Sequence, residues 1–222
     1  VNRVAGVVGG SLGGMQALEW SIMGGKDFVR CVVAIGCGAT HTGWQIGMSE
    51  TQRQAIYADP KWRDGRYPSH DPPHAGLAVA RQIAMCSYRS FEGFSNKFGR
   101  SVTEDGAFQV KNYLEYQGQK FLSRFDPLTY VQLTEQLDTH DVGRDRGGVA
   151  NALGKIDVPL LVIGIDSDIL YPLGMQQEVV DLTPGAKLKV VKSINGHDGF
   201  LLEQEDIGSA IKDFLVDPES SS

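Results

Sequence analysis

Continuous apolar runs of strand length occupy both ends of the chain and are separated by stretches in which apolar residues recur every three to four positions. The predicted strands are residues 4–8, 31–36, 158–165 and 187–191, and the predicted helices between and after them are residues 13–23, 172–182 and 199–215. Apolar strands that alternate with helices predict a parallel sheet covered on both faces, which is the α/β class.

The middle of the chain has little strand character. Its helical stretches lie at residues 76–88, 108–125 and 127–137, and clusters of glycine and proline mark the loops around them. This pattern predicts a helical insertion over the sheet. The expected organisation is a first part of the core at residues 1–42, a helical lid at 43–154, a second part of the core at 155–216 and a disordered tail at 217–222.

Charge and composition narrow the class of function. The net charge is −6 and no lysine-rich run occurs, which argues against a non-specific binder of nucleic acid or of anionic membranes and favours small-molecule chemistry. No apolar stretch is long enough to span a bilayer, and no signal-like segment opens the chain. The cysteines lack CxxC spacing and suit reduced thiols in the cytoplasm; they are Cys31, Cys37 and Cys86.

A serine lies between glycine pairs directly after the first predicted strand. GGSLG at residues 9–13 fits G-x-S-x-G between a strand and a helix, the context of a nucleophile elbow. The sharp turn strains the serine backbone and brings helix and strand close, so its neighbours must be small. Ser11 is the candidate nucleophile, and the N–H of Leu12 is a candidate oxyanion donor. A plain glycine-rich turn and a phosphate-binding turn are the alternatives, although no Walker lysine follows.

An acid and a histidine follow in the order that a hydrolase-type triad requires. Asp168 comes after the strand at 158–165, and His197 comes after the strand at 187–191. His197 would accept the serine proton, and Asp168 would orient the imidazole. Asp166 is a rival acid two residues away.

The other histidines do not indicate a metal site. His70 and His74 have i, i+4 spacing, but the two prolines between them exclude a helix that would place both on one face. His41 and His140 have no partner pattern and are expected in surface or loop positions. No metal ion is expected.

Five motifs together resemble the homoserine O-acetyltransferase family. They are GGSLGGMQALEW from Gly9, FGR at Phe98–Arg100, YLEYQGQKFLSRFD at Tyr113–Asp126, LDTHD at Leu137–Asp141 and GHDGFL at Gly196–Leu201. The resemblance implies an α/β-hydrolase fold with a helical lid, an acyl group passed from acetyl-CoA to the hydroxyl of L-homoserine in methionine biosynthesis, no cofactor, and a homodimer formed through the lid.

The same resemblance implies site residues. It gives Ser11 as the acylated nucleophile with Asp168 and His197 as its partners, Arg100 as a contact of the substrate carboxylate, and Asp198 as a contact of the substrate ammonium. An arginine fork and an aspartate are natural complements of an amino-acid acceptor.

Several alternatives stay open at the level of the sequence. The acyl group could be succinyl, the acceptor could be serine, the triad could serve an esterase, or the chain could be a non-catalytic binding module. In the α/β-hydrolase plan several strands precede the nucleophile strand. We therefore expect a C-terminal fragment of a longer protein that is unstable or inactive alone.

Overall fold

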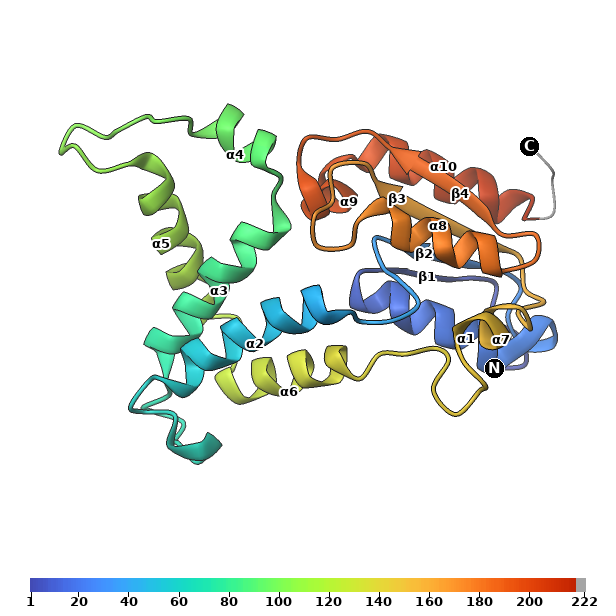
Figure 1. The fold of residues 1–222 in the computed structure, drawn as a ribbon, viewed down its shortest axis with the longest axis horizontal. Helices are drawn as coiled ribbons and strands as arrows, with labels where there is room; N and C mark the ends of the chain where they lie inside the picture. Colours follow the sequence, from blue (N-terminus) through green and yellow to red (C-terminus); the bar gives the residue numbers. More distant parts are fainter. Residues whose placement is uncertain (219–222) are drawn as a thin grey trace. The chain divides into compact units, whose positions relative to one another are not determined.

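The computed structural model describes residues 1–218, and they form two compact units (Figure 1). The sheet unit consists of residues 1–41 and the chain from His140 onward, and the helical unit consists of Thr42–Thr139. The expected tail begins at Asp217; Asp217 and Pro218 are described, and residues 219–222 lie outside the described part of the chain.

The sheet unit is built on four parallel strands in the order β1-β2-β3-β4. The strands are β1 (Val7–Gly10), β2 (Val32–Ile35), β3 (Leu160–Ile165) and β4 (Lys187–Val191). The predicted α/β fold with a parallel sheet is confirmed. The first strand begins later than predicted, because Val4 makes only an isolated bridge to Val29 and the ladder with β2 starts at Val7.

Helices cover both faces of this sheet. They are α1 (Leu12–Phe28), α7 (Val149–Leu153), α8 (Leu173–Leu182), α9 (Gly199–Leu202) and α10 (Gln204–Val216), with the 3₁₀ turn η2 at Gly196–Asp198. Ile163 and Ile165 of β3 pack with Ile207 and Phe214 of α10. Since side chains alternate along a strand, Gly164 points to the other face, where α8 packs closely. Figure 1 shows α1 on the same side as α8.

The helix predicted at 199–215 is interrupted. Glu203 has φ −86° and ψ 57°, outside the helical region, and separates α9 from α10. The break leaves a short α9 directly after the 3₁₀ turn that contains His197.

The helical unit packs around its own core. Its elements are α2 (Gly43–Tyr57), η1 (Arg63–Gly65), α3 (His74–Tyr88), α4 (Phe91–Lys97), α5 (Gln109–Leu122) and α6 (Pro127–Asp138). Its buried cluster consists of Ile56, Leu77, Ala80, Phe121, Tyr130 and Val131. Helix α2 has a polar buried face, in which Arg53 bonds to Glu50 at 2.9 Å and to Asp138 at 2.5 Å.

Residues 140–154 belong to the sheet unit, whereas the sequence placed them in the lid. Val142 and Leu153 are fully buried. Arg146 forms a two-pronged ion pair with Glu19 of α1, at 2.9 and 2.7 Å. These contacts hold the segment against α1, and no periodic pattern in its sequence predicts this position.

Candidate active site

The turn between β1 and α1 holds Ser11 in an unusual conformation. Ser11 has φ 55° and ψ −121°, a backbone geometry that a residue with a side chain adopts only under constraint. Its N–H donates to the carbonyl of Ile35 on β2 at 2.8 Å, and its own carbonyl accepts from Gly14 and Met15 at 2.9 and 3.1 Å. These bonds fix the serine at the carboxyl end of the sheet, immediately before a helix.

The glycines around Ser11 differ in how much room they have. A Cβ on Gly9 would lie 2.0 Å from the carbonyl oxygen of Gly13, and a Cβ on Gly14 would lie 2.7 Å from the sulfur of Cys37. A Cβ on Gly13 would meet nothing within 4 Å. Close approach of helix and strand therefore requires glycine at positions 9 and 14. Gly13, the last glycine of the G-x-S-x-G spacing, has room for a side chain.

The three residues of the predicted triad lie within hydrogen-bond distance of one another. His197 Nε2 is 2.9 Å from Ser11 Oγ, and His197 Nδ1 is 2.7 Å from Asp168 Oδ2. A carboxylate can only accept, so the proton lies on Nδ1 and Nε2 faces the serine as an acceptor. The order of groups is that of a nucleophile, a base and the acid that orients the base.

The two rival carboxylates have separate partners. Asp168 is buried, and its Oδ1 accepts the N–H groups of Leu170 and Tyr171 at 2.8 and 2.9 Å, which leaves Oδ2 for the imidazole. Asp166 accepts the N–H of Ser193 at 2.9 Å and so ties the β3 loop to the loop that carries His197. Asp166 therefore holds two loops together, and Asp168 is the carboxylate that bonds to the histidine.

Two aromatic rings pack against the imidazole of His197. The Tyr171 ring lies 5.2 Å from it at 41°, and the Phe200 ring lies 5.2 Å away at 66°. Phe200 also passes within 2.6 Å of the point where a Cβ on Gly10 would lie, so it fills the space between the nucleophile strand and the histidine. Phe200 lies within the GHDGFL motif, but the sequence assigned no role to either ring.

The remaining histidines are not alike. His41 lies in a loop, one of the two positions expected for it, but it is buried and shares a hydrogen bond of 2.8 Å with the Tyr171 hydroxyl. His140 is half-buried and lies 3.0 Å from the Gly38 carbonyl, and burial lowers its pKa. His70 lies in a turn and His74 begins α3, so the two do not share a helix. Within residues 1–218 no three potential ligands cluster as a metal site would need.

Three further predicted residues have the following positions. Leu12 is the first residue of α1, so its N–H has no carbonyl inside the helix to bond with, as an oxyanion donor requires. Asp198 is half-buried in η2, next to His197. Arg100 is exposed in the helical unit, where its guanidinium lies 5.5 Å from the Phe108 ring. The structure thus places Leu12 and Asp198 beside the triad and Arg100 in the other unit.

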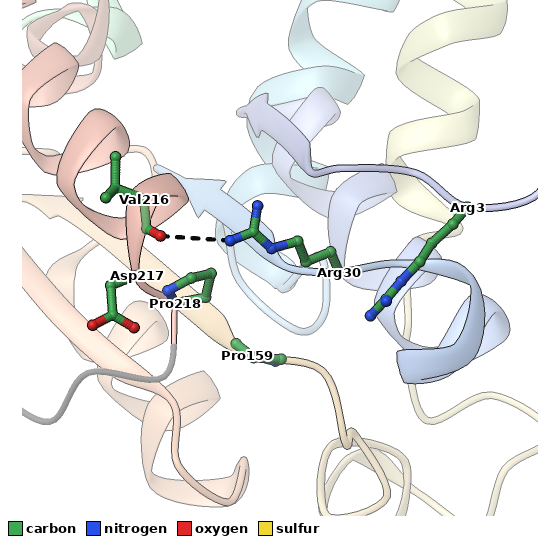
Figure 2. A pocket seen from close by; sticks show the side chains of 6 residues that line it. All are labelled: Arg3, Arg30, Pro159, Val216, Asp217 and Pro218. Atoms are coloured by element: carbon green, nitrogen blue, oxygen red, sulfur yellow. Dashed lines mark hydrogen bonds between the residues drawn. The ribbon is translucent and has the colours of Figure 1, made fainter.

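A cavity of about 270 Å³ lies elsewhere on the sheet unit (Figure 2). It is lined by Arg3, Arg30, Pro159, Val216, Asp217 and Pro218, and the Arg30 guanidinium donates to the Val216 carbonyl at 3.5 Å. Arg30 and Pro159 precede β2 and β3, whereas Ser11, Asp168 and His197 follow the strands. The cavity is therefore at the opposite edge of the sheet from the triad.

Comparison with known proteins agrees with this geometry. The model of the alpha/beta hydrolase fold family matches residues 2–204. The chain belongs to the α/β-hydrolase fold family. In this family the elbow serine, the acid and the histidine follow separate strands, in the chain order seen here.

One curated relative within the fold family carries the predicted name. The chain is 50% identical over 217 residues to the homoserine O-acetyltransferase of Salinibacter ruber, which confirms the resemblance inferred from the motifs. That alignment covers 95% of the chain and 62% of the relative, so the chain spans about three fifths of the relative's length.

Solved structures show the same α/β-hydrolase fold. The homoserine O-acetyltransferase of Bacillus anthracis aligns with a TM-score of 0.91 at 20% identity, covering 100% of this chain and 62% of that one. Esterase E22 aligns with a TM-score of 0.87 at 19% identity, covering 97% and 62%. At these identities the likeness shows the fold alone, since one neighbour is named a transferase and the other an esterase.

Proposed function

We propose that the protein containing this chain is a homoserine O-acetyltransferase, which moves an acetyl group from acetyl-CoA to the hydroxyl of L-homoserine in methionine biosynthesis. The observation that carries the proposal is the Ser11–His197–Asp168 hydrogen-bonded series at a strained strand-to-helix turn. The identity to curated enzymes of that name favours this reaction over the other reactions that the fold serves. The reaction needs no cofactor, because every proton moves between side chains and substrates.

In the first half-reaction Ser11 Oγ attacks the thioester carbonyl carbon of acetyl-CoA. His197 Nε2 takes the hydroxyl proton, and Asp168 stabilises the imidazolium through the 2.7 Å bond to Nδ1. The carbonyl oxygen becomes an oxyanion, to which the Leu12 N–H at the start of α1 donates. Collapse breaks the carbon–sulfur bond, His197 returns its proton to the thiolate, and acetyl-Ser11 and CoA result.

The second half-reaction reverses these roles. The homoserine hydroxyl gives its proton to His197 and attacks the acetyl carbonyl, the Ser11–acyl bond breaks, and Ser11 regains a proton from the imidazolium. Water competes with homoserine for the acyl-enzyme. We infer that the helical unit acts as a lid that excludes water and orients the alcohol.

Two charged residues suit the acceptor of this reaction. Asp198 follows the base directly and offers a carboxylate for the homoserine ammonium, and Arg100 offers a fork for its carboxylate. Asp198 is in the sheet unit beside His197, whereas Arg100 reaches the substrate from the lid in this proposal.

A homodimer formed through the lid accompanies the proposed activity. Its support is a set of large apolar or aromatic side chains that the helical unit leaves exposed: Phe91, Val102, Phe108 and Tyr116. Exposed rings of this size are typical of association surfaces.

No helix of residues 1–218 is long and apolar enough to cross a membrane. A cytoplasmic location is proposed because acetyl-CoA is the donor and the three cysteines are free thiols.

The test is formation and use of the acyl-enzyme. The protein is mixed with acetyl-CoA, and intact-mass spectrometry follows the acetyl adduct; L-homoserine is then added and O-acetylhomoserine is measured. We expect the adduct in wild type and none in Ser11→Ala. An adduct in Ser11→Ala contradicts the nucleophile. Transfer to L-serine, use of succinyl-CoA, or release of acetate with no effect of homoserine would favour a serine acetyltransferase, a succinyltransferase or an esterase, respectively.

A further inference from the structure

Tyr171 contacts both partners of the candidate nucleophile. Its backbone N–H donates to Asp168 Oδ1 at 2.9 Å, and its ring packs on the His197 imidazole with 5.2 Å between centroids. Only 2% of the residue is exposed. The side chain is therefore a wall of the site as well as a neighbour of the acid.

The hydroxyl of Tyr171 has a partner from a distant part of the chain. His41 Nε2 lies 2.8 Å from it, the two rings are 5.9 Å apart, and His41 is 8% exposed. Burial of two polar side chains is unfavourable unless they bond to each other, so this contact fixes the rotation of the tyrosine ring.

His41 is itself held at the point where the chain leaves the sheet unit. Its backbone N–H donates to the His140 carbonyl at 2.9 Å, and the Val142 N–H donates to the Ala39 carbonyl at 3.0 Å. Thr40 and Asp141 form an antiparallel bridge between these two bonds. The outgoing and returning segments thus form a short ladder from which the His41 side chain reaches Tyr171.

The imidazole of His197 needs this support from the side. Its two nitrogens are fixed in direction by Ser11 and Asp168, but hydrogen bonds at two ring atoms leave the ring free to tilt about the line that joins them. The rings of Phe200 and Tyr171 both pack against the imidazole and limit this tilt. A tilt about that line leaves Nε2 in place but turns its lone pair away from Ser11 Oγ, and proton transfer is fast only when the reacting groups are aligned.

We propose that His41 and Tyr171 are positioning residues, a hydrogen-bonded pair that holds His197 at the angle needed to take the proton of Ser11. The proposal rests on the proposed function, because it assigns the pair to the base of that reaction. It links the rate of serine activation to the ladder at residues 39–41 and 140–142, where the chain leaves the sheet unit and returns to it.

The experiment measures activation of Ser11 with a probe that needs neither substrate. The full chain is treated with a fluorophosphonate, and the rate of Ser11 labelling is followed by mass spectrometry in wild type, Tyr171→Phe, His41→Ala, the double variant and His41→Gln. Tyr171→Phe keeps the ring and loses only the hydroxyl. Tyr130→Phe is the matched control, since Tyr130 is also buried and its hydroxyl bonds to Gln52 within the helical unit.

We expect Tyr171→Phe and His41→Ala each to slow labelling about fivefold, the effect of one lost hydrogen bond. The double variant should be no slower than either single one, because both remove the same bond. His41→Gln should recover most of the rate, since an amide can bond to the hydroxyl, and Tyr130→Phe should label at the wild-type rate. In acetyl transfer, Tyr171→Phe, His41→Ala and the double variant should lower kcat and leave KM for acetyl-CoA unchanged.

Two results would overturn the proposal. One is wild-type labelling by Tyr171→Phe, which is close enough in shape to remain folded; the other is a double variant whose loss is the product of the single losses. A third result separates the two proposals. If wild type is labelled but does not transfer acetyl to homoserine, while Tyr171→Phe and His41→Ala are labelled slowly, the proposed function is contradicted and the positioning role is supported.

Discussion

Alanine substitutions at two glycines of the elbow should have opposite effects. Gly9→Ala places a Cβ 2.0 Å from the Gly13 carbonyl oxygen and 2.2 Å from its carbon, both backbone atoms that no rotamer change can move. Gly13→Ala places a Cβ in open space inside the first turn of α1. A consensus based on G-x-S-x-G treats the two positions alike, whereas the contacts separate them.

The magnitudes follow from these contacts. To accept a Cβ at position 9, the start of α1 must move by roughly 1 Å or more, and overpacking of this kind costs about 3 kcal/mol. For a chain of this length that is a fall in Tm of about 6–12 °C. Gly13→Ala should raise Tm by about 1–4 °C, because alanine restricts the unfolded chain at no cost in contacts.

Thermal unfolding by circular dichroism and labelling by a fluorophosphonate measure the two consequences. The shift of α1 in Gly9→Ala carries Ser11 away from His197, so labelling should slow by about a hundredfold even in the folded fraction. Gly13→Ala should label within about twofold of wild type. Equal Tm values for the two variants, or a Gly13→Ala variant less stable than Gly9→Ala, would refute the assignment of the close approach to Gly9.

Three other predictions follow from single contacts. Asp168→Asn should slow acyl-enzyme formation by about 10³- to 10⁴-fold and Asp166→Ala by less than about tenfold; stopped-flow acylation that reverses this order would assign the histidine contact to Asp166. Burial lowers the pKa of His140 below its usual value of 6.5. Below pH 6.5 the unfolded state therefore binds more protons than the folded state, so the Tm should fall as the pH drops from about 6.5. A Tm that falls as steeply in His140→Gln as in wild type would exclude His140 as the cause. Burial raises the pKa of Cys37 to about 12, so iodoacetamide should alkylate the exposed Cys86 in the native protein and reach Cys37 only after unfolding, as peptide mass spectrometry can check.

The meeting of Ser11, Asp168 and His197 was predictable from the sequence because it depends on topology. Each residue follows a strand of one parallel sheet, and the carboxyl ends of such strands share an edge. Four apolar runs were enough to place that edge. The choice between Asp166 and Asp168 was harder, since both follow β3, and it depends on the turn that the Asp168 N–H closes onto Ile165 at 3.2 Å.

The pair His41 and Tyr171 could not be found this way. The two residues are separated by 130 positions, and a buried histidine has no periodic signature. Helix α2 was missed for a related reason. Its buried residues are mostly polar: Ile56 joins the apolar cluster, whereas Gln52 and Arg53 are held by a hydrogen bond to Tyr130 and an ion pair with Asp138. Amphipathic periodicity detects helices that bury apolar faces, and the buried face of this helix is mostly polar.

The register of the sheet ties the site to the fold. Gly10 pairs with Ile35, Ile35 pairs with Ile163, and the Ser11 N–H continues this series by bonding to the Ile35 carbonyl. A slip of one residue between β1 and β2 would turn the core face of the strand outward and would also remove that bond, so the elbow forms only in the correct register. Because Ser11, Asp168 and His197 each extend a different strand, the site exists only when β1, β3 and β4 are all in place. Loss of fluorophosphonate labelling on heating should therefore coincide with loss of the sheet, rather than precede it as local unfolding of a loop would.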